Sequence, residues 1–228
     1  RKLCLQSPVW YAAQLKPSFV IIENVSALET LWQGPYFLDQ LVKGLHGLGY
    51  QTDIWNFNAV NYGAFQSRKR AFVVGWRGNR KPLPPMPTHG NIPLLPLLTL
   101  GEAIGHLSET EALSDGLCPM SKTRTERIRG IKPGEHTCKS VRRLSMDEPC
   151  RTLTTSPSCQ KMSRFIHPYQ DRHLSVVEYK FIMGVPNYRF PTMMPVPWRY
   201  RVLGNGNPPC LYQAVVDALL AKTASAPA

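Results

Sequence analysis

The clearest apolar pattern in this chain is a short run, Phe19 to Ile22, that ends on Glu23 and Asn24. Four consecutive apolar residues are typical of a strand that is covered on both faces. A carboxylate directly after such a run lies at the carboxyl end of the strand, where open α/β sheets bind their ligands. The pattern predicts a buried strand with a polar site at its end, while a second interpretation is that Glu23 only binds a loop donor.

Helical periodicity marks the elements on either side of this strand. Residues 8–16 favour a short helix that ends before Pro17, because the residue before a proline avoids the helical conformation. A longer amphipathic helix follows the strand, and Gly47 and Gly49 predict its end. Its apolar residues recur at helical spacing: Leu38, Leu41, Val42, Leu45 and Leu48.

The next part of the chain has the pattern of a strand pair and then of a linker. Residues 51–57 and 70–76 have strand character and are joined by a polar loop at 58–63. Six prolines then fall within 81–96, a density that breaks helices and central strands and indicates a boundary.

Four elements are expected in the second half of the chain. They are helices at 98–104, 172–183 and 208–222 and a β-like stretch at 144–155. The helix at 172–183 begins with a capping box, in which Ser175 is the N-cap and Glu178 stands three residues later.

Composition bounds the class of protein. The chain has 228 residues, of which 43% are hydrophobic and 18% charged, enough for the core of one large or two small domains. No apolar run predicts a transmembrane helix, and the first residues do not have the pattern of a signal peptide. The six cysteines form no C-x-x-C pair, which favours reduced thiols. Because Cys118, Cys138, Cys150 and His136 match no zinc spacing, no metal site is expected.

The charge of the chain points to a polyanionic partner. The net charge is +12, with 27 Lys and Arg against 15 Asp and Glu. The excess is concentrated between Lys122 and Arg143, where only Glu126 and Glu135 oppose eight basic residues. The eight are Lys122, Arg124, Arg127, Arg129, Lys132, Lys139, Arg142 and Arg143.

Five short motifs occur in one order along the chain. They are Glu23-Asn24-Val25, the run from Gln66 to Arg70, Glu148-Pro149-Cys150-Arg151-Thr152-Leu153-Thr154-Thr155, Arg172 to Glu178 with Gly184-Val185-Pro186, and Gly204 to Pro209. This order resembles that of the DNA (cytosine-5)-methyltransferase family, with its E-N-V, Q-x-R-x-R, E-P-x-x-T, R-x-L-S-x-x-E and G-N-x-x-P-P motifs. Each motif alone is weak, whereas together they span nearly the whole chain.

The resemblance implies roles for three charged residues. Glu23 would hydrogen-bond ring N3 and the exocyclic amine of a cytosine, and Arg70 would donate to its O2. Arg68 would complete the catalytic set by positioning the loop or the backbone. The alternative is that Arg68 and Arg70 only flank a strand. In the implied reaction the cytosine leaves the DNA stack to enter this site.

The resemblance also implies S-adenosyl-L-methionine as cofactor. The segment Gly204-Asn205-Gly206 fits a turn whose backbone approaches a ligand closely, so Asn205 and Gly206 are expected to line the cofactor pocket. Cys4 would occupy a position that neighbours the cofactor. An ordinary glycine turn before a helix is the alternative interpretation. Arg172, Leu174 and Glu178 are expected to be structural.

Two parts of the family's pattern are missing: the Pro-Cys loop that carries the nucleophile and the glycine-rich cofactor loop. Cys150 and Cys210 both follow a proline, but neither follows a strand as that loop does. Three explanations remain open. The chain is a fragment of an enzyme, one subunit of a split enzyme whose amino-terminal half is a separate chain, or a non-catalytic DNA-binding or regulatory homologue.

The partner that the resemblance implies is double-stranded DNA, bound by a small target-recognition region. Arg127, Arg129 and Lys132 are expected to contact phosphates, which position the protein without specifying a sequence. Base readout is assigned to a polar loop, with a solvated loop as the alternative. Its candidate residues are Ser156, Ser158, Gln160 and Lys161.

The expected fold is α/β, part of a Rossmann-like methyltransferase sheet with a small target-recognition region. The expected divisions are 1–80 for the carboxyl-terminal part of the catalytic domain, 81–165 for target recognition and 166–228 for the return to the catalytic domain. The expected function is transfer of a methyl group to carbon 5 of cytosine. An unrelated basic nucleic-acid-binding module would require all the motifs to be accidental. The expected location is the nucleus in a eukaryote or the cytoplasm in a bacterium.

Overall fold

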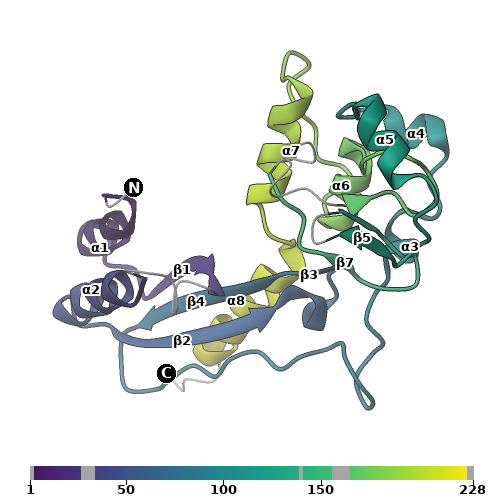
Figure 1. Ribbon diagram of the computed structural model, residues 1–228. Helices are drawn as coiled ribbons and strands as arrows, with labels where there is room; N and C mark the ends of the chain where they lie inside the picture. Colours follow the sequence, from purple (N-terminus) through teal and green to yellow (C-terminus); the bar gives the residue numbers. More distant parts are fainter. Residues whose placement is uncertain (1–2, 27–33, 139–140, 156–164, 225–228) are drawn as a thin grey trace. The chain divides into compact units, whose positions relative to one another are not determined.

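The chain forms two compact units in a computed structural model (Figure 1), which describes residues 3–26, 34–138, 141–155 and 165–224. The first unit comprises 1–58, 69–86 and 214–228, and the second comprises 59–68 and 87–213. Side chains are described for the same ranges apart from 3–6, 137–138 and 222–224.

The first unit is built on a three-stranded antiparallel sheet in the order β1-β4-β2. Its strands are β1 (Phe19–Val25), β2 (Gln51–Asn58) and β4 (Lys69–Trp76). Glu23 lies opposite Phe72 in the register of β1 and β4, and Trp55 lies opposite the same residue from β2. The central strand is therefore β4, which is buried at every position after Lys69.

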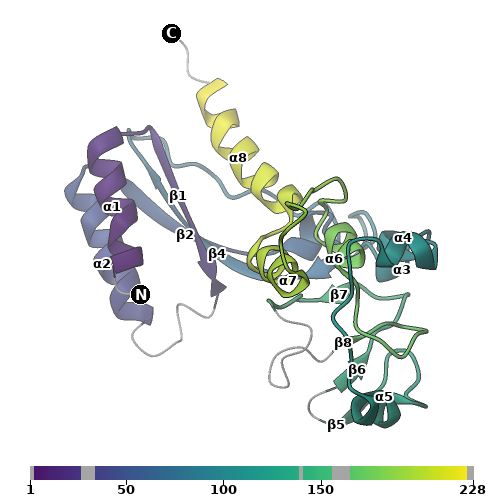
Figure 2. The ribbon, with the colours of Figure 1, turned by 90° about the horizontal axis from the view of Figure 1, so that it is seen from above.

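Helices α1 (Leu3–Leu15) and α2 (Gly34–Gly47) cover one face of this sheet. The predicted amphipathic stripe of α2 is confirmed, since Leu41 and Leu45 are buried against Val73 of β4. Gly49 follows with φ +79, the left-handed conformation that favours glycine after a helix. Figure 2 shows the later part of α8 (Pro209–Ala224) on the opposite face of the sheet, where Val215 and Leu219 are buried.

The expectation that β1 is covered on both faces is wrong for the described residues. Only β4 pairs with β1, and the side chain positions of β1 are partly or fully exposed, with Ile21 at 36%. The strands beside it are antiparallel, so the carboxyl end of β1 meets the start of β4 rather than the ends of parallel neighbours. The apolar runs of β1 and β4 are similar in sequence, yet β1 lies at the edge of the sheet and β4 at its centre.

The second unit contains short elements around its own core. Helices α3 (Leu100–Ile104), α6 (Val176–Ile182) and α7 (Val196–Asn205) supply most of the buried apolar side chains. The remaining elements are η2 (Ala59–Tyr62), β3 (Gln66–Ser67), α4 (Glu109–Leu113), α5 (Lys122–Ile128), β5 (His136–Cys138), β6 (Val141–Arg143), β7 (Cys150–Arg151) and β8 (Phe165–Ile166). β3 pairs with β7, and β6 lies between β5 and β8.

Two predictions of irregular or β structure in the second unit need correction. Residues 58–63 were expected to be a polar loop, but Ala59, Val60 and Tyr62 form a 3-10 turn and are buried. The stretch 144–155 has only the two-residue strand β7, because its backbone pairs with β3 alone. The capping box of α6 is confirmed, since the Ser175 hydroxyl accepts from the Glu178 N–H and the Glu178 carboxylate accepts from the Ser175 N–H.

The compact units do not coincide with the expected divisions of the chain. Residues 166–213 belong to the same compact unit as 87–165, and their expected return to the catalytic domain stays a prediction. The proline-rich segment does contain a boundary, between Met86 and Pro87. Among the residues that the structure describes, no helix combines the length and apolar character needed to cross a membrane.

Candidate functional site

An ion pair between Glu23 and Arg70 forms the candidate site in the first unit. Side chains at alternate positions of a strand share a face, and directly opposite residues of paired strands share it too. Glu23 faces Phe72 across the ladder, and Arg70 stands two residues before Phe72, so both charged side chains project from the face opposite α1 and α2. The Arg70 Nε and the Glu23 Oε1 are 2.6 Å apart.

Aromatic side chains from the same face surround Arg70. Phe57 lies opposite Arg70 in the ladder between β2 and β4, and its ring centroid is 5.8 Å from that of Phe72. The side chain of Arg70 is only 10% exposed and that of Glu23 is 23% exposed. Water is therefore largely removed from the guanidinium, which strengthens its interaction with a nearby carboxylate.

The arrangement can bind a planar polar group by its edge. A carboxylate accepts hydrogen bonds and a guanidinium donates them, so the pair presents acceptor and donor atoms close together. Arg70 Nη1 also donates to the Lys69 carbonyl at 2.7 Å, which fixes the orientation of the guanidinium. The motifs predict that Glu23 and Arg70 lie together, and in the structure their side chains are in contact.

Arg68, which was placed in the catalytic set with the role of positioning the loop or the backbone, binds other segments of the chain. It lies in the second unit and is 2% exposed. Its guanidinium donates to the Leu153 carbonyl at 3.0 Å, to the Gly204 carbonyl at 2.8 Å and to the Asn207 Oδ1 at 2.7 Å. These bonds join three segments, so the structure assigns Arg68 a positioning role.

Gln66 has the same function as Arg68, and the sequence analysis did not identify it. Its side chain is fully buried, its Nε2 lies 2.9 Å from the Met183 sulfur, and its Oε1 accepts from the Leu153 N–H at 3.2 Å. The signal was available, since Gln66 and Arg68 are the first two polar positions of the Q-x-R-x-R motif. Both anchor the stretch around Leu153, which includes the E-P-x-x-T motif.

The expected glycine turn at 204–206 is in part the end of a helix. Gly204 and Asn205 are the last residues of α7, and Gly206 is its C-cap with φ −69. Gly204 is required by a close approach to protein backbone, because a Cβ there would lie 2.4 Å from the Thr154 carbonyl oxygen. Asn205 is exposed and its role towards the cofactor stays a prediction, as does that of Gly206.

The residues predicted to bind DNA divide into two groups. Arg127, Arg129 and Lys132 are exposed at and after the end of α5, where phosphate contacts are sterically open. Ser158, Gln160 and Lys161 lie outside the described residues, and the side chain of Cys4, the other expected cofactor neighbour, is likewise not described.

Arg143, counted in the basic segment, is not a surface cation. It is 4% exposed and donates to the carbonyls of His167, Gln170 and Ile128 and to the carboxylate of Asp171. This buried guanidinium joins the end of α5 to the loop before α6. A basic residue in a charge cluster can thus be structural.

The prediction that Arg172 and Glu178 are structural is confirmed. Arg172 Nη1 and Nη2 donate to the two carboxylate oxygens of Glu178 at 2.9 and 2.6 Å, and Glu178 is 2% exposed. The same carboxylate caps α6, so one buried acid fixes both the helix and the loop before it.

The two cysteines that follow prolines are poor nucleophiles. Burial raises the pKa of the Cys150 thiol to about 12, and it also raises the pKa of Cys210. A thiol reacts as its thiolate, so both are held in the unreactive form at neutral pH. Within the described ranges, no group of three or more His, Cys, Asp or Glu side chains is placed to hold a metal ion.

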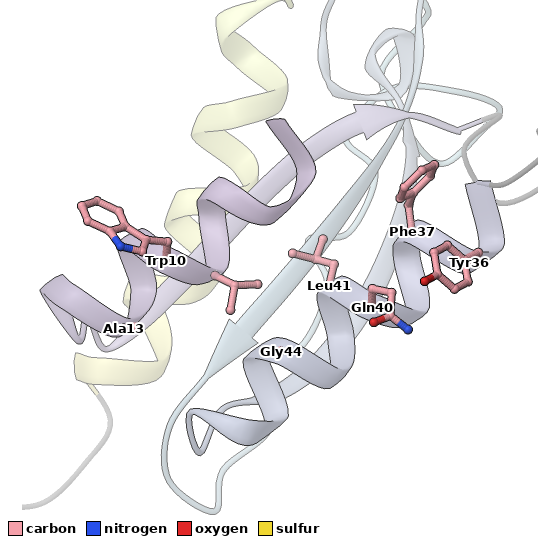
Figure 3. Close-up of a pocket in the computed structure, with 8 residues that line it drawn as sticks. Trp10, Ala13, Tyr36, Phe37, Gln40, Leu41 and Gly44 are labelled. Atoms are coloured by element: carbon pink, nitrogen blue, oxygen red, sulfur yellow. The ribbon is translucent and has the colours of Figure 1, made fainter. Parts of the chain in front are cut away.

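A separate apolar pocket of about 410 Å³ lies between α1 and α2 (Figure 3). Its lining side chains come from these two helices and carry no charge. They are Val9, Trp10, Ala13, Tyr36, Phe37, Gln40, Leu41 and Gly44. The pocket contains none of the predicted site residues, and it offers no ionic partner for a charged substrate.

Comparison with known proteins places these features in context. Residues 9–221 match the model of the family of C-5 cytosine-specific DNA methylases. The type II methyltransferase M.AplI of Arthrospira platensis is 30% identical over 215 residues, which cover 91% of this chain and 58% of that protein. M.Sau96I of Staphylococcus aureus is 28% identical over 231 residues, covering 91% of this chain and 52% of that protein. The chain spans little more than half the length of these relatives.

Solved structures share the fold at low sequence identity. A candidate DNA modification methyltransferase encoded within an E. coli prophage superposes with a TM-score of 0.74 at 19% identity, covering 95% of this chain and 73% of that one. The methyltransferase EhMeth of Entamoeba histolytica gives 0.65 at 15% identity, covering 97% and 70%. These matches show a mixed α/β fold like that of the two solved proteins.

Proposed function

Because the chain belongs to the C-5 cytosine-specific DNA methylase family, we propose that it is the carboxyl-terminal part of a DNA cytosine-5 methyltransferase that uses S-adenosyl-L-methionine. The observation that carries the proposal is the ion pair of Glu23 and Arg70 on one face of the sheet. The E-N-V and Q-x-R-x-R motifs supply these two residues, and they meet only because β1 and β4 are paired.

In the proposed reaction the pair holds a cytosine that has left the DNA stack. One carboxylate oxygen of Glu23 accepts from the exocyclic amine, and a proton taken up from solvent when the base binds is shared between the other oxygen and ring N3. Arg70 donates to O2. Attack on carbon 6 places electron density on N3 and O2, so both contacts strengthen as the reaction proceeds. The ion pair of the ligand-free chain keeps Arg70 oriented until the base replaces part of it.

The nucleophilic cysteine is proposed to come from outside these 228 residues. This fits the raised pKa of the Cys150 and Cys210 thiols, which disfavours the reactive thiolate in both. The chain also covers only 58% of M.AplI and 52% of M.Sau96I. The missing Pro-Cys and glycine-rich loops can lie on the same gene product or on a partner chain.

Among the predicted cofactor neighbours, Asn205 has an exposed polar side chain, which suits a contact to S-adenosyl-L-methionine. When bound, this cofactor supplies the methyl group. Gly206 stands next to it, and an added Cβ there would make an ordinary van der Waals contact with the Met183 methyl carbon at 3.4 Å. The double-stranded DNA partner fits the exposed cations Arg127, Arg129 and Lys132.

Methyl transfer from labelled cofactor to duplex DNA tests the proposal, using the full-length protein that contains this chain or the chain combined with its amino-terminal half. We expect Glu23→Gln to lower the rate by about 100-fold or more, since an amide cannot protonate N3. Asp39→Asn is the matched control, because it neutralises an exposed carboxylate of α2 in the same unit.

Three outcomes would overturn the proposal in different ways. Wild-type rates from Glu23→Gln would remove Glu23 from catalysis. Activity of the 228 residues alone would place the nucleophile within them. Absence of methyl transfer in the full-length protein, with DNA binding intact, would favour the non-catalytic homologue.

A further inference from the structure

Helix α7 has two different faces. Tyr200 and Leu203 are buried in the core of the second unit, and Val196 packs against the same core. The opposite side presents Trp198, Arg201, Val202 and Asn205, all exposed. These four residues follow the spacing i, i+3, i+4 and i+7, so they form one continuous stripe along the helix.

The stripe is unusual because its largest members are apolar. Trp198 is 52% exposed and Val202 is 38% exposed. The guanidinium carbon of Arg201 lies 4.9 Å from the centre of the Trp198 ring, a cation–π contact on the surface. Tryptophan and arginine are the residues most enriched among energetically important contacts at interfaces. The stripe therefore has the composition of a binding surface.

Charge indicates what kind of partner fits this surface. From Gly184 to Pro208 the sequence contains three arginines and no Asp or Glu. Arg199 is used internally, since it donates to the carbonyls of Met194 and Asp115. Arg189 and Arg201 are exposed. A stretch that presents an exposed indole and cations and contains no Asp or Glu of its own is complementary to a nucleic-acid backbone.

We infer that Trp198 and Arg201, in the exposed stripe of α7, form a second DNA-backbone contact, distinct from the basic segment 122–143. Arg201 donates to a phosphate oxygen, and the Trp198 indole packs against the neighbouring deoxyribose. Both contacts are independent of base sequence, so they position the duplex without selecting it. The identity of the partner as DNA rests on the proposed function, whereas the surface itself does not.

Fluorescence anisotropy with a labelled duplex, measured at several salt concentrations on the full-length protein, tests this inference. We expect Trp198→Ala to weaken binding about tenfold for all duplex sequences, equivalent to about 1.4 kcal/mol. Arg201→Ala should reduce the slope of log K against log salt by about 1. Trp198→Phe and Arg201→Lys should retain most of the affinity.

Trp10→Ala is the matched control, because Trp10 is a comparably exposed tryptophan, at 59%, on α1 of the first unit. It should leave DNA binding unchanged. Thermal unfolding should be unaffected by all these variants, since the altered side chains are exposed.

The results separate failure of this inference from failure of the proposed function. If Arg127→Ala weakens DNA binding but Trp198→Ala and Arg201→Ala do not, the stripe is no DNA contact and the inference is wrong. If the stripe variants instead separate this chain from its amino-terminal half or from a second copy in sedimentation, its partner is protein. If no variant matters because the protein does not bind DNA, the proposed function fails first.

Discussion

Arg68 and Arg70 stand two residues apart in one motif, yet their side chains make different contacts. Arg70 lies at the start of β4 and pairs with Glu23 across the sheet. Arg68 precedes the strand and is enclosed by the carbonyls of Leu153 and Gly204. The chain passes from the second unit to the first between Arg68 and Lys69. The motif therefore joins an anchoring residue of the second unit to the arginine that pairs with Glu23 in the first.

Arg68 gives a prediction at the residue scale. Arg68→Met should lower the free energy of unfolding by about 3–5 kcal/mol, because it leaves buried carbonyls without a donor. Arg68→Lys should lose less, since an ammonium can still donate to one or two of them. Urea denaturation measures both. The exposed Arg127→Ala, expected within about 0.5 kcal/mol of wild type, is the control.

An equal loss for Arg68→Met and Arg127→Ala would contradict the positioning role. The sequence could pair Glu23 with Arg70 because the family's motifs place both residues at a cytosine. It could not distinguish the burial of Arg68, since both arginines flank the same apolar run and only long-range contacts to 153 and 204 separate them. The burial of Arg143, within the basic segment, could not be predicted from the sequence for the same reason.

Elements with strong local periodicity were predictable, and those defined by pairing were not. The stripe of α2 and the capping box of α6 follow from side chains a few residues apart, so local spacing identified both. The apolar runs of β1 and β4 look alike in sequence. Which of them is central depends on β2 pairing with β4, a contact between distant segments.

Helix α7 supports a prediction about packing at the element scale. Gly204→Ala should destabilise the protein by about 3 kcal/mol, because the new Cβ would clash with the backbone of Thr154 and Thr155. Gly47→Ala, at the end of α2, should be neutral or stabilising by up to about 1 kcal/mol, since nothing lies within 4 Å of its Cβ position. Thermal unfolding of the two variants compares Gly→Ala at a crowded and at an open position. Equal destabilisation by both would contradict the close approach of Gly204 to Thr154.

At the scale of the whole molecule, buried histidines make the fold sensitive to acid. The Nδ1 of His167 accepts from the backbone N–H groups of Tyr169 and Gln170, so protonation there would remove two hydrogen bonds. Burial lowers the pKa of His167 to about 4, and burial likewise lowers that of His173 to about 4. Both residues are neutral in the folded chain at pH 7.

Because these folded pKa values lie below the ordinary value of 6.5, the unfolded chain binds protons first as the pH falls. Stability should therefore be complete above pH 6.5 and decline towards pH 4, by about 2 kcal/mol per histidine at pH 5. His167→Asn keeps an acceptor without the titration, so its unfolding free energy should change less between pH 7.5 and 5. The exposed His46→Gln is the control, and parallel pH profiles for wild type and His167→Asn would contradict the argument.

The exposed cations of the chain give a second prediction at the scale of the whole molecule. Replacing Arg127 and Arg129 with Ala should weaken DNA binding for all sequences alike and reduce its salt slope by about 2, since each cation releases about one counterion. Lys43→Ala, which removes an exposed cation of α2 paired with Asp39, is the control. Loss of binding to one sequence only would assign these arginines to base readout instead.

The chain passes between the two compact units four times, at 58/59, 68/69, 86/87 and 213/214. A chimaera that exchanges only 87–213 between relatives would therefore leave behind 59–68, the ten residues that contain Gln66 and Arg68. The transplanted segment 87–213 would then contact the Gln66 and Arg68 of the recipient and not those of its own protein. An exchange of the proposed target-recognition part between relatives should therefore transplant both segments together, so that Gln66 and Arg68 come from the same protein as the stretch around Leu153 that they bind.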